Sequence, residues 1–422
     1  KGADVGKSNP MPTKPQDIPA WTDWTKFWSL CTNDMLVDIA QRAKKVYPEA
    51  DVSTNPITGH YLNGFHAASV NTATNPWLTA KNLDSLHIDF YSVGYLQAYL
   101  RSLAGTAKGR PVYISEAGGS GTPKRAKYMT MYAFAYGADG VTFWRRDHHI
   151  PPNVALGIAD AMDALNDAKL QSSSEPVTDG LGLMFSLDSL YLMNAMESVW
   201  PYLAPWQGGA QMLTRMQVLY DMYSDKRLAK EIPSHLEVIF APGAKAVSEK
   251  TFTSLREFVA DGGTLVVDDL FAVYDKYGNR RQSAKIERLL ERPNVTQLAE
   301  KKLRAWRRSL GKNDHNPMGW ATPLPDWSDK LDAIVRERVP RTVCCVNDKG
   351  ELAAVAPGAR KVSEDLLYVF VDPWAEDVSV QVQGRFDVVQ ERFANKKKKV
   401  SHEEGQTHIS LTEGPALLRF SR

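Results

Sequence analysis

Short apolar runs alternate with helical patterns through the first 165 residues of the chain. A helix is expected over roughly 33–47, since its apolar residues share one face, namely Leu36, Ile39, Ala40, Ala43 and Val46. Four apolar runs predict strands that each end in polar residues: "DVSTNP" (51–56), "LHIDFYS" (86–92), "PVYISEAG" (111–118) and "GVTFWRRD" (140–147). Strand–helix–strand repetition of this kind predicts a parallel sheet.

Four strands are half of the eight that close a (β/α)₈ barrel, in which the carboxyl ends of the strands form the active face. An open half-barrel leaves two exposed parallel edges, which do not persist alone. We therefore expect a half-barrel over residues 1–170, with about four further strands supplied from elsewhere.

A Ser/Pro-rich stretch, "QSSSEPVTDG" (171–180), separates this region from a second α/β region. "LGLMFSLDS", "HLEVIFAPGA" and "TLVVDD" predict strands, with a long helix over about 203–223. "SEKTFTSLREFVADGG" predicts an amphipathic helix capped by its first serine. The pattern indicates a smaller doubly wound α/β domain over 176–335, charged and irregular from about 276 onward.

The last part of the chain alternates apolar and polar residues in six short runs: "TVCCVND", "LLYVFVDP", "VSVQVQG", "RFDVVQERF", "THISLTEG" and "ALLRFS". Turn residues separate the runs, which predicts a small antiparallel β-sandwich over 338–422. Lys396 to Lys399 form a basic run that we interpret as a solvated hairpin or loop. The vicinal Cys344 and Cys345 fit the core of this domain.

Composition narrows the range of partners. Lys and Arg number 51 against 49 Asp and Glu, so the formal charge is only +2. This balance argues against nucleic acid or an anionic membrane as the main partner. No apolar run is long enough for a membrane span. No Cys/His cluster has zinc spacing, and "DHH" at 147–149 reads as loop polarity, so we expect neither a metal nor a cofactor.

The strand "VYISE" carries the clearest chemical signal. Alternation places Glu116 on the side of Val112 and Ile114, which puts it at the mouth of a barrel if that side faces inward. Gly118 and Gly119 then let the chain turn away without covering it. On this motif alone, a catalytic carboxylate and a surface salt bridge remain equal alternatives.

Polar residues at the other strand ends strengthen the catalytic reading. Asp89 and Tyr91 share a face of their strand, and a tyrosine hydroxyl beside a carboxylate can hold it ionised and oriented. Trp144 could form the floor of a sugar subsite, Arg145 could pair with the carboxylate or a substrate hydroxyl, and Asn55 could bind a sugar hydroxyl. Packing or surface pairing explains each residue alone; together, four successive polar strand ends favour a carbohydrate site.

The order "TNP…DFY…ISEAGG…YGADGVTFWRRD" resembles the second half of the barrel in clan A glycoside hydrolases, and most of all family 42, the microbial β-galactosidases. The resemblance covers residues 27–275 and extends to the tail by arrangement only. It implies strands five to eight of a TIM barrel, a non-catalytic amidotransferase-like domain that builds a trimer, and a terminal β-domain. A homo-oligomer, a carbohydrate substrate and a bacterial protein, cytoplasmic or secreted, are implied with it. Any targeting segment would lie upstream of Lys1.

Carried over by this resemblance, Glu116 is the nucleophile at the end of the seventh strand, and Tyr91 lies beside it at the sixth. Trp144 and Arg145 take the end of the eighth strand, and Asn55 that of the fifth. The implied reaction is retaining hydrolysis of a β-galactoside, which requires two carboxyl groups roughly 5–5.5 Å apart.

The family's second carboxyl group is a glutamate in an Asn-Glu pair that ends the fourth strand. In this chain the only glutamate before Glu116 is Glu49, which enters the fifth strand at the opposite end of the barrel. The sequence is therefore a fragment of a longer enzyme, one chain of a split enzyme, or a degenerate relative that binds carbohydrate without cleaving it. An amidotransferase is excluded, because no cysteine lies between 32 and 343 to serve as its nucleophile.

Overall fold

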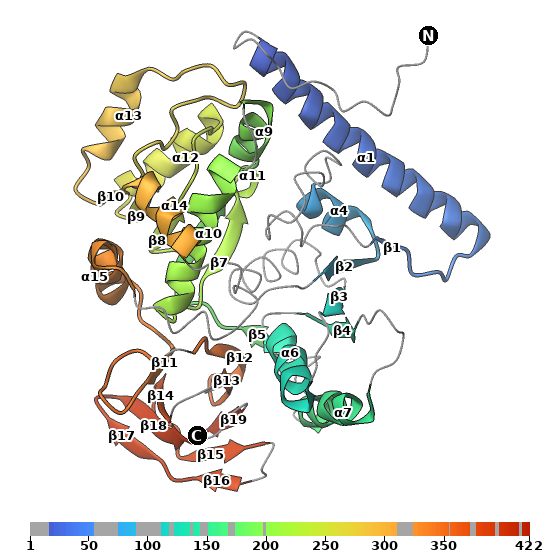
Figure 1. The fold of residues 1–422 in the computed structure, drawn as a ribbon, viewed down its shortest axis with the longest axis vertical. Helices are drawn as coiled ribbons and strands as arrows, with labels where there is room; N and C mark the ends of the chain where they lie inside the picture. Colours follow the sequence, from blue (N-terminus) through green and yellow to red (C-terminus); the bar gives the residue numbers. More distant parts are fainter. Residues whose placement is uncertain are drawn as a thin grey trace.

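The computed structural model describes residues 17–54, 75–89, 111–117, 122–135, 138–143, 151–167, 174–196, 200–309, 324–353, 355–371, 377–392, 396–412 and 416–422. These residues form four sheets with helices around them (Figure 1). The first two sheets are wholly parallel, and the two nearest the C-terminus are antiparallel. The expected succession of parallel sheets and antiparallel strands is confirmed.

The first sheet consists of strands β1 (Ser53–Thr54), β2 (Ser85–Asp89), β3 (Val112–Ala117) and β4 (Gly140–Phe143), paired in that order. All four predicted strands are present. Helices around it are α4 (Pro76–Asn82), α6 (Pro123–Ala135) and α7 (Pro152–Asp167). Each of these helices starts on a proline, whose missing N–H costs nothing in the first turn and whose fixed φ suits a helix.

Helix α1 (Ile18–Val46) begins well before the expected 33–47. Its buried residues are small or polar, namely Thr22, Thr25, Ser29, Asn33 and Ala40. Of the apolar residues expected to share one face, Ala40 is buried, whereas Ile39 and Val46 are 51% and 68% exposed. The apolar face was therefore the wrong guide to which side of α1 is buried. The Thr22 and Thr25 hydroxyls donate to the carbonyls of Ile18 and Trp21, which lets these polar side chains pack.

The second sheet has the strand order β10–β9–β8–β6–β7. The strands are β6 (Leu181–Phe185), β7 (Asp221–Ser224), β8 (Val238–Ala241), β9 (Thr264–Asp268) and β10 (Val295–Leu298). The chain starts at β6, adds β7 on one side and then crosses to β8, β9 and β10 on the other, which is a doubly wound order. Every residue of β6, β8 and β9 is buried, as expected of parallel strands covered on both faces.

Helices cover this sheet on both sides (Figure 1). They are α9 (Leu187–Met196), α10 (Trp200–Arg215), α11 (Asp225–Leu228), α12 (Glu249–Ala260), α13 (Ser283–Leu290), α14 (Glu300–Ser309) and, beyond them, α15 (Asp329–Arg338). The Ser248 hydroxyl accepts from the Thr251 N–H at 3.1 Å, which confirms the predicted cap of α12. No helix in the described ranges combines the length and apolar character needed to cross a bilayer.

Two expectations about this region are wrong. The helix predicted over 203–223 ends at Arg215, and the chain then forms β7. The part beyond 276 is not irregular, since it contains α13, β10, α14 and α15. Its many charged residues lie on the solvent side of helices that form the outer layer, so charge density was no sign of a loop.

The C-terminal strands form two antiparallel sheets. One has the order β11 (Val343–Val346), β14 (Val378–Gln383), β18 (Gln406–Leu411) and β17 (Ser401–Glu403). The other has the order β16 (Lys396–Lys398), β15 (Val388–Glu391), β19 (Ala416–Ser421), β13 (Leu366–Val371), β12 (Gly358–Ser363) and β5 (Glu175–Pro176). All six predicted strands are present. The basic run forms a hairpin strand against β15, and Cys345 is buried while Cys344 is half-buried.

Gln217 joins the second parallel sheet to the antiparallel region. Its side-chain amide donates to the carbonyls of Cys345 and Ala353 at 2.8 and 2.9 Å, and its Oε1 accepts from the Cys345 N–H at 2.6 Å. The residue is buried and has a φ of 55°, a left-handed value that is uncommon outside glycine. Three side-chain hydrogen bonds to β11 and to the segment that follows it hold this strained backbone in place.

We predict that Gln217→Ala lowers the free energy of unfolding by roughly 1–3 kcal/mol, because it leaves the Cys345 N–H buried without a partner and removes one of the two hydrogen bonds accepted by each of the Cys345 and Ala353 carbonyls. Urea denaturation followed by circular dichroism would measure the change. Gln297→Ala, on an exposed position of β10, is the control and should stay within about 0.5 kcal/mol of the parent. Equal effects of the two substitutions would show that the Gln217 contacts contribute nothing.

Candidate active site at the carboxyl ends of the first sheet

The carboxyl ends of β1 to β4 meet at one edge of the first sheet, because all neighbouring pairs are parallel. In the register, Asp89 lies opposite Ser115, and Ala117 lies opposite Phe143. Glu116 therefore lies one residue beyond the Asp89 level, on a strand flanked by neighbours on both sides. The backbone positions of Asp89 and Glu116 come together at the same edge, as the sequence predicted.

Strand β3 carries an irregularity at this edge. Ile114 pairs with Val141 and Ala117 pairs with Phe143, so β3 has one residue more than β4 between the two pairs. The extra residue falls at Ser115–Glu116, which makes Glu116 part of a β-bulge. Bulges are frequent beside active sites, where they re-aim a side chain.

Four of the other predicted site residues, Asn55, Tyr91, Trp144 and Arg145, lie outside the described residues. The side chains of Asp89 and Glu116 do as well, although their backbones belong to β2 and β3. Carboxyl separations and hydrogen bonds at the mouth therefore stay predictions. What the structure supplies is the register that brings two of the six predicted positions to one edge.

Further down the strands, two aromatic rings on neighbouring strands pack against each other. The rings of His87 on β2 and Tyr113 on β3 lie 5.0 Å apart between centroids. On the next strand, a Cβ on Gly140 would lie 2.8 Å from Cδ1 of Tyr113, so only glycine leaves room for that ring. These contacts fix the relative positions of three neighbouring strands, at the middle of β2 and at the amino ends of β3 and β4.

Polar contacts lie at the opposite end of this sheet, where its strands begin. Asp84 accepts from Lys44 Nζ at 2.7 Å and from the Val52 N–H at 3.1 Å. Glu49 lies exposed in the loop that enters β1, at the amino ends of the strands. A carboxyl group there cannot act together with Glu116 at the carboxyl ends.

A pair of buried carboxyl groups in the second sheet region was missed by the sequence reasoning. Asp188 follows β6 and Asp225 follows β7, and both side chains are fully buried. Lys226 Nζ lies 2.5 Å from Asp188 and 3.5 Å from Asp225, while Lys26 of α1 lies 3.2 Å from Asp188. The sequence did carry a signal for this pair, because polar residues follow directly after two buried strands.

This charged cluster ties α1 to the second sheet rather than forming a site. Both carboxyl groups are covered and engaged by lysines, and no group of three or more His, Cys, Asp or Glu side chains in the described part of the chain could hold a metal ion. Burial raises the pKa of the Asp225 carboxyl to about 6; the Lys226 charge opposes this rise and the Asp188 charge adds to it.

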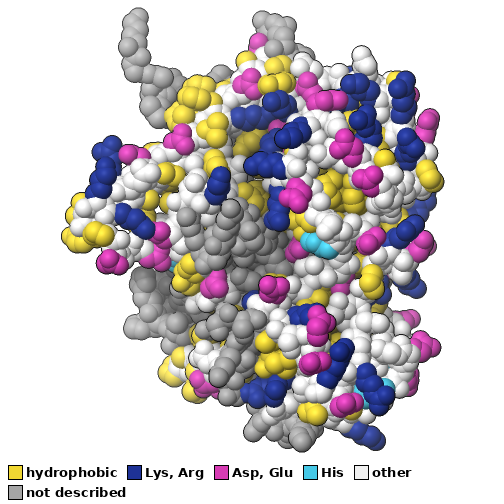
Figure 2. Space-filling view, turned by 180° about the vertical axis from the view of Figure 1, so that it is seen from behind, with side chains coloured by type: hydrophobic (Ala, Val, Ile, Leu, Met, Phe, Trp, Pro, Cys, Tyr) yellow, Lys and Arg dark blue, Asp and Glu magenta, His cyan; other side chains and the backbone are white. Residues whose placement is uncertain are grey.

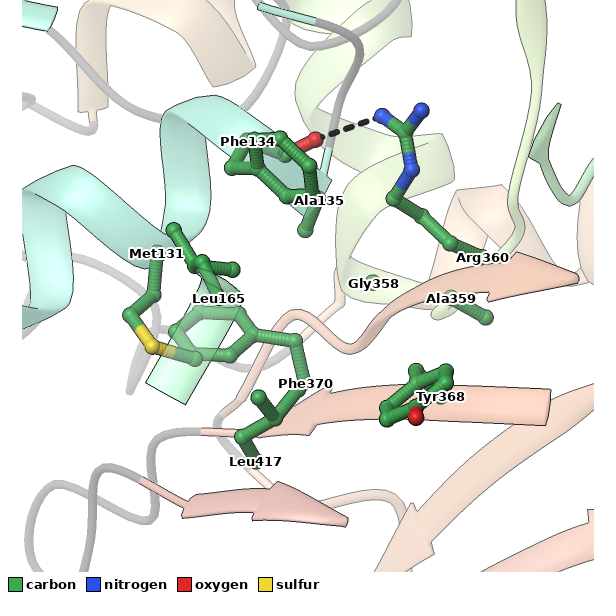
Figure 3. A pocket seen from close by; sticks show the side chains of 10 residues that line it. All are labelled: Met131, Phe134, Ala135, Leu165, Gly358, Ala359, Arg360, Tyr368, Phe370 and Leu417. Carbon is green, nitrogen blue, oxygen red and sulfur yellow. Dashed lines mark hydrogen bonds between the residues drawn. The ribbon is translucent and has the colours of Figure 1, made fainter. Parts of the chain in front are cut away.

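A hollow lies between α6, α7 and the six-stranded C-terminal sheet, and Arg360 lines it (Figure 3). The contacts of Arg360 there hold the structure together. Arg360 donates from Nε and Nη2 to Ser174 Oγ and O, both at 2.7 Å, and from Nη1 to the Phe134 carbonyl at 2.8 Å. Its guanidinium also lies 4.7 Å from the centroid of the Phe134 ring, and burial lowers its pKa to about 10. The walls are otherwise largely apolar, so this hollow offers a sugar few partners.

Comparison with known proteins identifies the fold. No family model and no curated protein matches the sequence. Among solved structures, the β-galactosidase from Rahnella sp. R3 matches with a TM-score of 0.67 at 12% identity, over 99% of this chain and 70% of that one. Gan42B, a family 42 β-galactosidase from G. stearothermophilus, matches with a TM-score of 0.66 at 13% identity, over 100% and 70%.

A third match is the family 42 exo-carrageenase from Bacteroides ovatus, with a TM-score of 0.62 at 11% identity, over 96% of this chain and 56% of that one. The chain has the fold of the family 42 glycoside hydrolases. The family 42 resemblance is thereby confirmed at the level of the fold, across nearly the whole chain. The chain spans little more than half the length of the carrageenase and 70% of the two galactosidases.

The raised pKa of Asp225 predicts a pH-dependent stability. A folded-state pKa of about 6 against an ordinary value of 3.8 favours the folded state below about pH 4, and this contribution is lost as the pH rises through about 6. Asp225→Asn removes this pH-dependent contribution. The free energy of unfolding of the variant, relative to that of the parent, should therefore rise by about 2 kcal/mol between pH 4.5 and 7.5. Urea unfolding at both pH values measures it.

Asp261→Asn, at an exposed position that ends α12, serves as the control for this series. A pH-independent difference between the parent and Asp225→Asn would contradict the burial of an ionisable carboxyl at this position.

Proposed function

We propose that the chain supplies the nucleophile of a retaining glycoside hydrolase that cleaves β-galactoside-type linkages. The observation that carries the proposal is the position of Glu116. It lies in a bulge at the carboxyl edge of an inner parallel strand, in a fold shared with family 42 enzymes. The carboxyl edge is where a parallel barrel positions its catalytic groups.

In the proposed reaction the Glu116 carboxylate attacks the anomeric carbon while a second carboxylic acid protonates the departing glycosidic oxygen. Water, deprotonated by that second group, then attacks the glycosyl ester, and the sugar leaves with Glu116 restored as a carboxylate. The Tyr91 hydroxyl holds the nucleophile ionised and oriented, and Asp89 binds the sugar. Asn55, Trp144 and Arg145 bind the sugar through hydrogen bonds and ring stacking.

The second carboxyl group belongs to a half-barrel that completes the first sheet, carried by the same precursor or by a separate chain. The arrangement proposed here is strands five to eight of a TIM barrel over 1–170, an amidotransferase-like domain over 176–335 and a β-sandwich over 338–422. A homo-oligomer, such as a trimer built by the middle domain, fits this arrangement.

The galactoside specificity is supported by two structural relatives that are themselves β-galactosidases. The carrageenase shows that the same fold also serves an enzyme named for another polysaccharide. A catalytically incomplete carbohydrate-binding or assembly protein is the second candidate. It is favoured by one observation: Glu49, the sole glutamate ahead of Glu116 in the sequence, lies in the loop at the amino ends of the strands.

The proposal predicts that Glu116→Gln abolishes hydrolysis of an aryl β-galactoside by the assembly that contains the completing half-barrel. The loss should be on the order of 10³-fold or more in kcat, because the amide cannot attack the anomeric carbon. Glu49→Gln is the matched control and should keep the parent rate. An activated 2-deoxy-2-fluorogalactoside should leave its glycosyl group on the peptide that contains Glu116.

Labelling of another carboxylate would show that Glu116 is not the nucleophile. A complete assembly that binds galactosides without turning them over would establish the binding protein instead.

A further inference from the structure

Helix α14 has the highest net charge of the described helices. Its ten residues, "EKKLRAWRRS", include five cations and one carboxyl group, which gives a net charge of +4. The whole chain carries only +2, so this charge is local rather than part of a generally basic surface. Helices α12 and α15, which also belong to the outer layer, each carry a net charge of zero. The side of the molecule shown in Figure 2 likewise has Lys and Arg side chains beside Asp and Glu side chains.

The basic side chains of α14 lie toward solvent. Leu303 and Trp306 are buried on the inner side, where α14 packs against α10 (Figure 1). At 100° per residue, Lys301, Arg304 and Arg308 lie within an arc of about 60° on the side opposite to these two residues. Lys301 and Arg308 are exposed, as is the neighbouring Lys302, and Arg304 is half-buried. We call these four residues the basic face of α14: Lys301, Lys302, Arg304 and Arg308.

Little of this charge is neutralised. Glu300 is the one carboxyl group of the helix; it is buried, pairs with Arg304 and lies 3.4 Å from Lys245 Nζ. A single negative charge shared by two cations leaves one positive charge over. Lys301, Lys302 and Arg308 form no ion pair in the part of the chain that the structure describes. These three exposed cations are therefore available to an anion.

Helix stability does not account for the arrangement. Lys301 and Lys302 lie in the first turn, where the positive end of the helix dipole disfavours cations. Arg304 and Arg308 are four residues apart, and like charges at this spacing repel each other. A surface that is merely solvated mixes both signs of charge, as α12 does. The basic face therefore indicates a ligand whose negative charge relieves this repulsion.

The spacing of the charges suits a ligand with several anionic groups. From Lys301 to Arg308 the helix rises about 10 Å, which is about one Debye length at physiological salt. The four cations therefore act on such a ligand together. Ala305 is exposed between them, and its small side chain leaves room for a chain molecule to lie across the helix. A guanidinium binds a carboxylate, or a sulfate of similar geometry, through two parallel N–H groups.

An indole ring borders the basic face. Lys302 Nζ lies 5.9 Å from the centroid of the Trp327 ring, which belongs to the short helix η4 (Asp326–Ser328). Trp327 is half-buried and packs against the core, so its position is fixed. Rings of this type combine an apolar body with a polar edge and provide a platform for a sugar ring. Cations beside such a ring suit a sugar that carries an acidic group.

Two other anionic partners fit less well. An anionic membrane requires an apolar face beside the basic one, whereas the large apolar residues of α14, Leu303 and Trp306, are buried. Nucleic acid is bound by extended basic surfaces. Here α14 carries +4 of a total of +2, which leaves a net charge of −2 for the rest of the chain.

We propose that the basic face of α14 binds an anionic polysaccharide, whose sulfate or carboxylate groups pair with the basic side chains while a sugar ring lies against Trp327. The choice of a polysaccharide among polyanions rests on the proposed function. The surface belongs to the second sheet region and not to the carboxyl edge of the first sheet, so it holds the polymer and does not cleave it.

Titration of the full chain with polymers tests the proposal. The probes are a sulfated galactan, the same galactan after desulfation, and polygalacturonate, each followed by calorimetry in about 0.1 M salt. We expect at least one of the two anionic polymers to bind at least tenfold more tightly than the neutral one, and the tighter of the two identifies the acidic group. Equal binding of all three polymers overturns the proposal, as does tighter binding of single-stranded DNA.

Charge reversal locates the site. Lys301→Glu combined with Arg308→Glu should weaken binding of the anionic polymer at least tenfold. The matched control is Lys250→Glu combined with Arg256→Glu, at exposed positions of α12, which changes the net charge equally and should leave the affinity within about twofold of the parent. Equal losses in the two variants overturn the proposal. Circular dichroism checks folding, and Lys301→Gln combined with Arg308→Gln should give a smaller loss in the same direction.

Hydrolysis has no part in these measurements. A chain that binds the anionic polymer through α14 but leaves β-galactosides intact refutes the proposed function and keeps the binding surface. An active assembly whose affinity does not respond to the α14 substitutions does the opposite.

Discussion

Parallel strands need cover on both faces, and this constraint organises the molecule. The second sheet meets it: helices lie on both sides, and β6, β8 and β9 are buried along their full length. Its outer strands β10 and β7 pair on one side only, as do β1 and β4 of the first sheet among the described strands. The buried inner strands therefore hold the second sheet together.

The sheet regions are joined by polar contacts rather than by large apolar faces alone. Gln217 links the second sheet to the antiparallel strands through both ends of its amide, and Asp179 accepts from Leu219 and Thr342 N–H groups at 2.8 and 3.0 Å. Arg360 joins α6 to the six-stranded sheet. Each contact satisfies backbone groups that burial would otherwise leave without partners, so each also specifies how the regions fit together.

The sequence was a good guide wherever a periodic pattern and burial agree. All four strands of the first sheet and the six C-terminal runs were predictable, because short apolar runs between turn residues leave few alternatives. Helix α1 was misread because its apolar face is not the one that is buried. Strand β7 was hidden behind a helical pattern, since four residues are too few to show a period of two. The position of Glu116 was predictable from its strand end, whereas the bulge was not, because a bulge appears only in the pairing with β4.

The two-residue strand β5 changes what the Ser/Pro-rich stretch means for the molecule. Composition marks this stretch as a boundary between two regions, yet Glu175 and Pro176 pair with β12, and Arg360 donates to both the backbone carbonyl and the hydroxyl of Ser174. The same guanidinium donates to the Phe134 carbonyl at the end of α6. The boundary segment is therefore also an edge strand of the six-stranded sheet, and it ties that sheet to the helices of the first one.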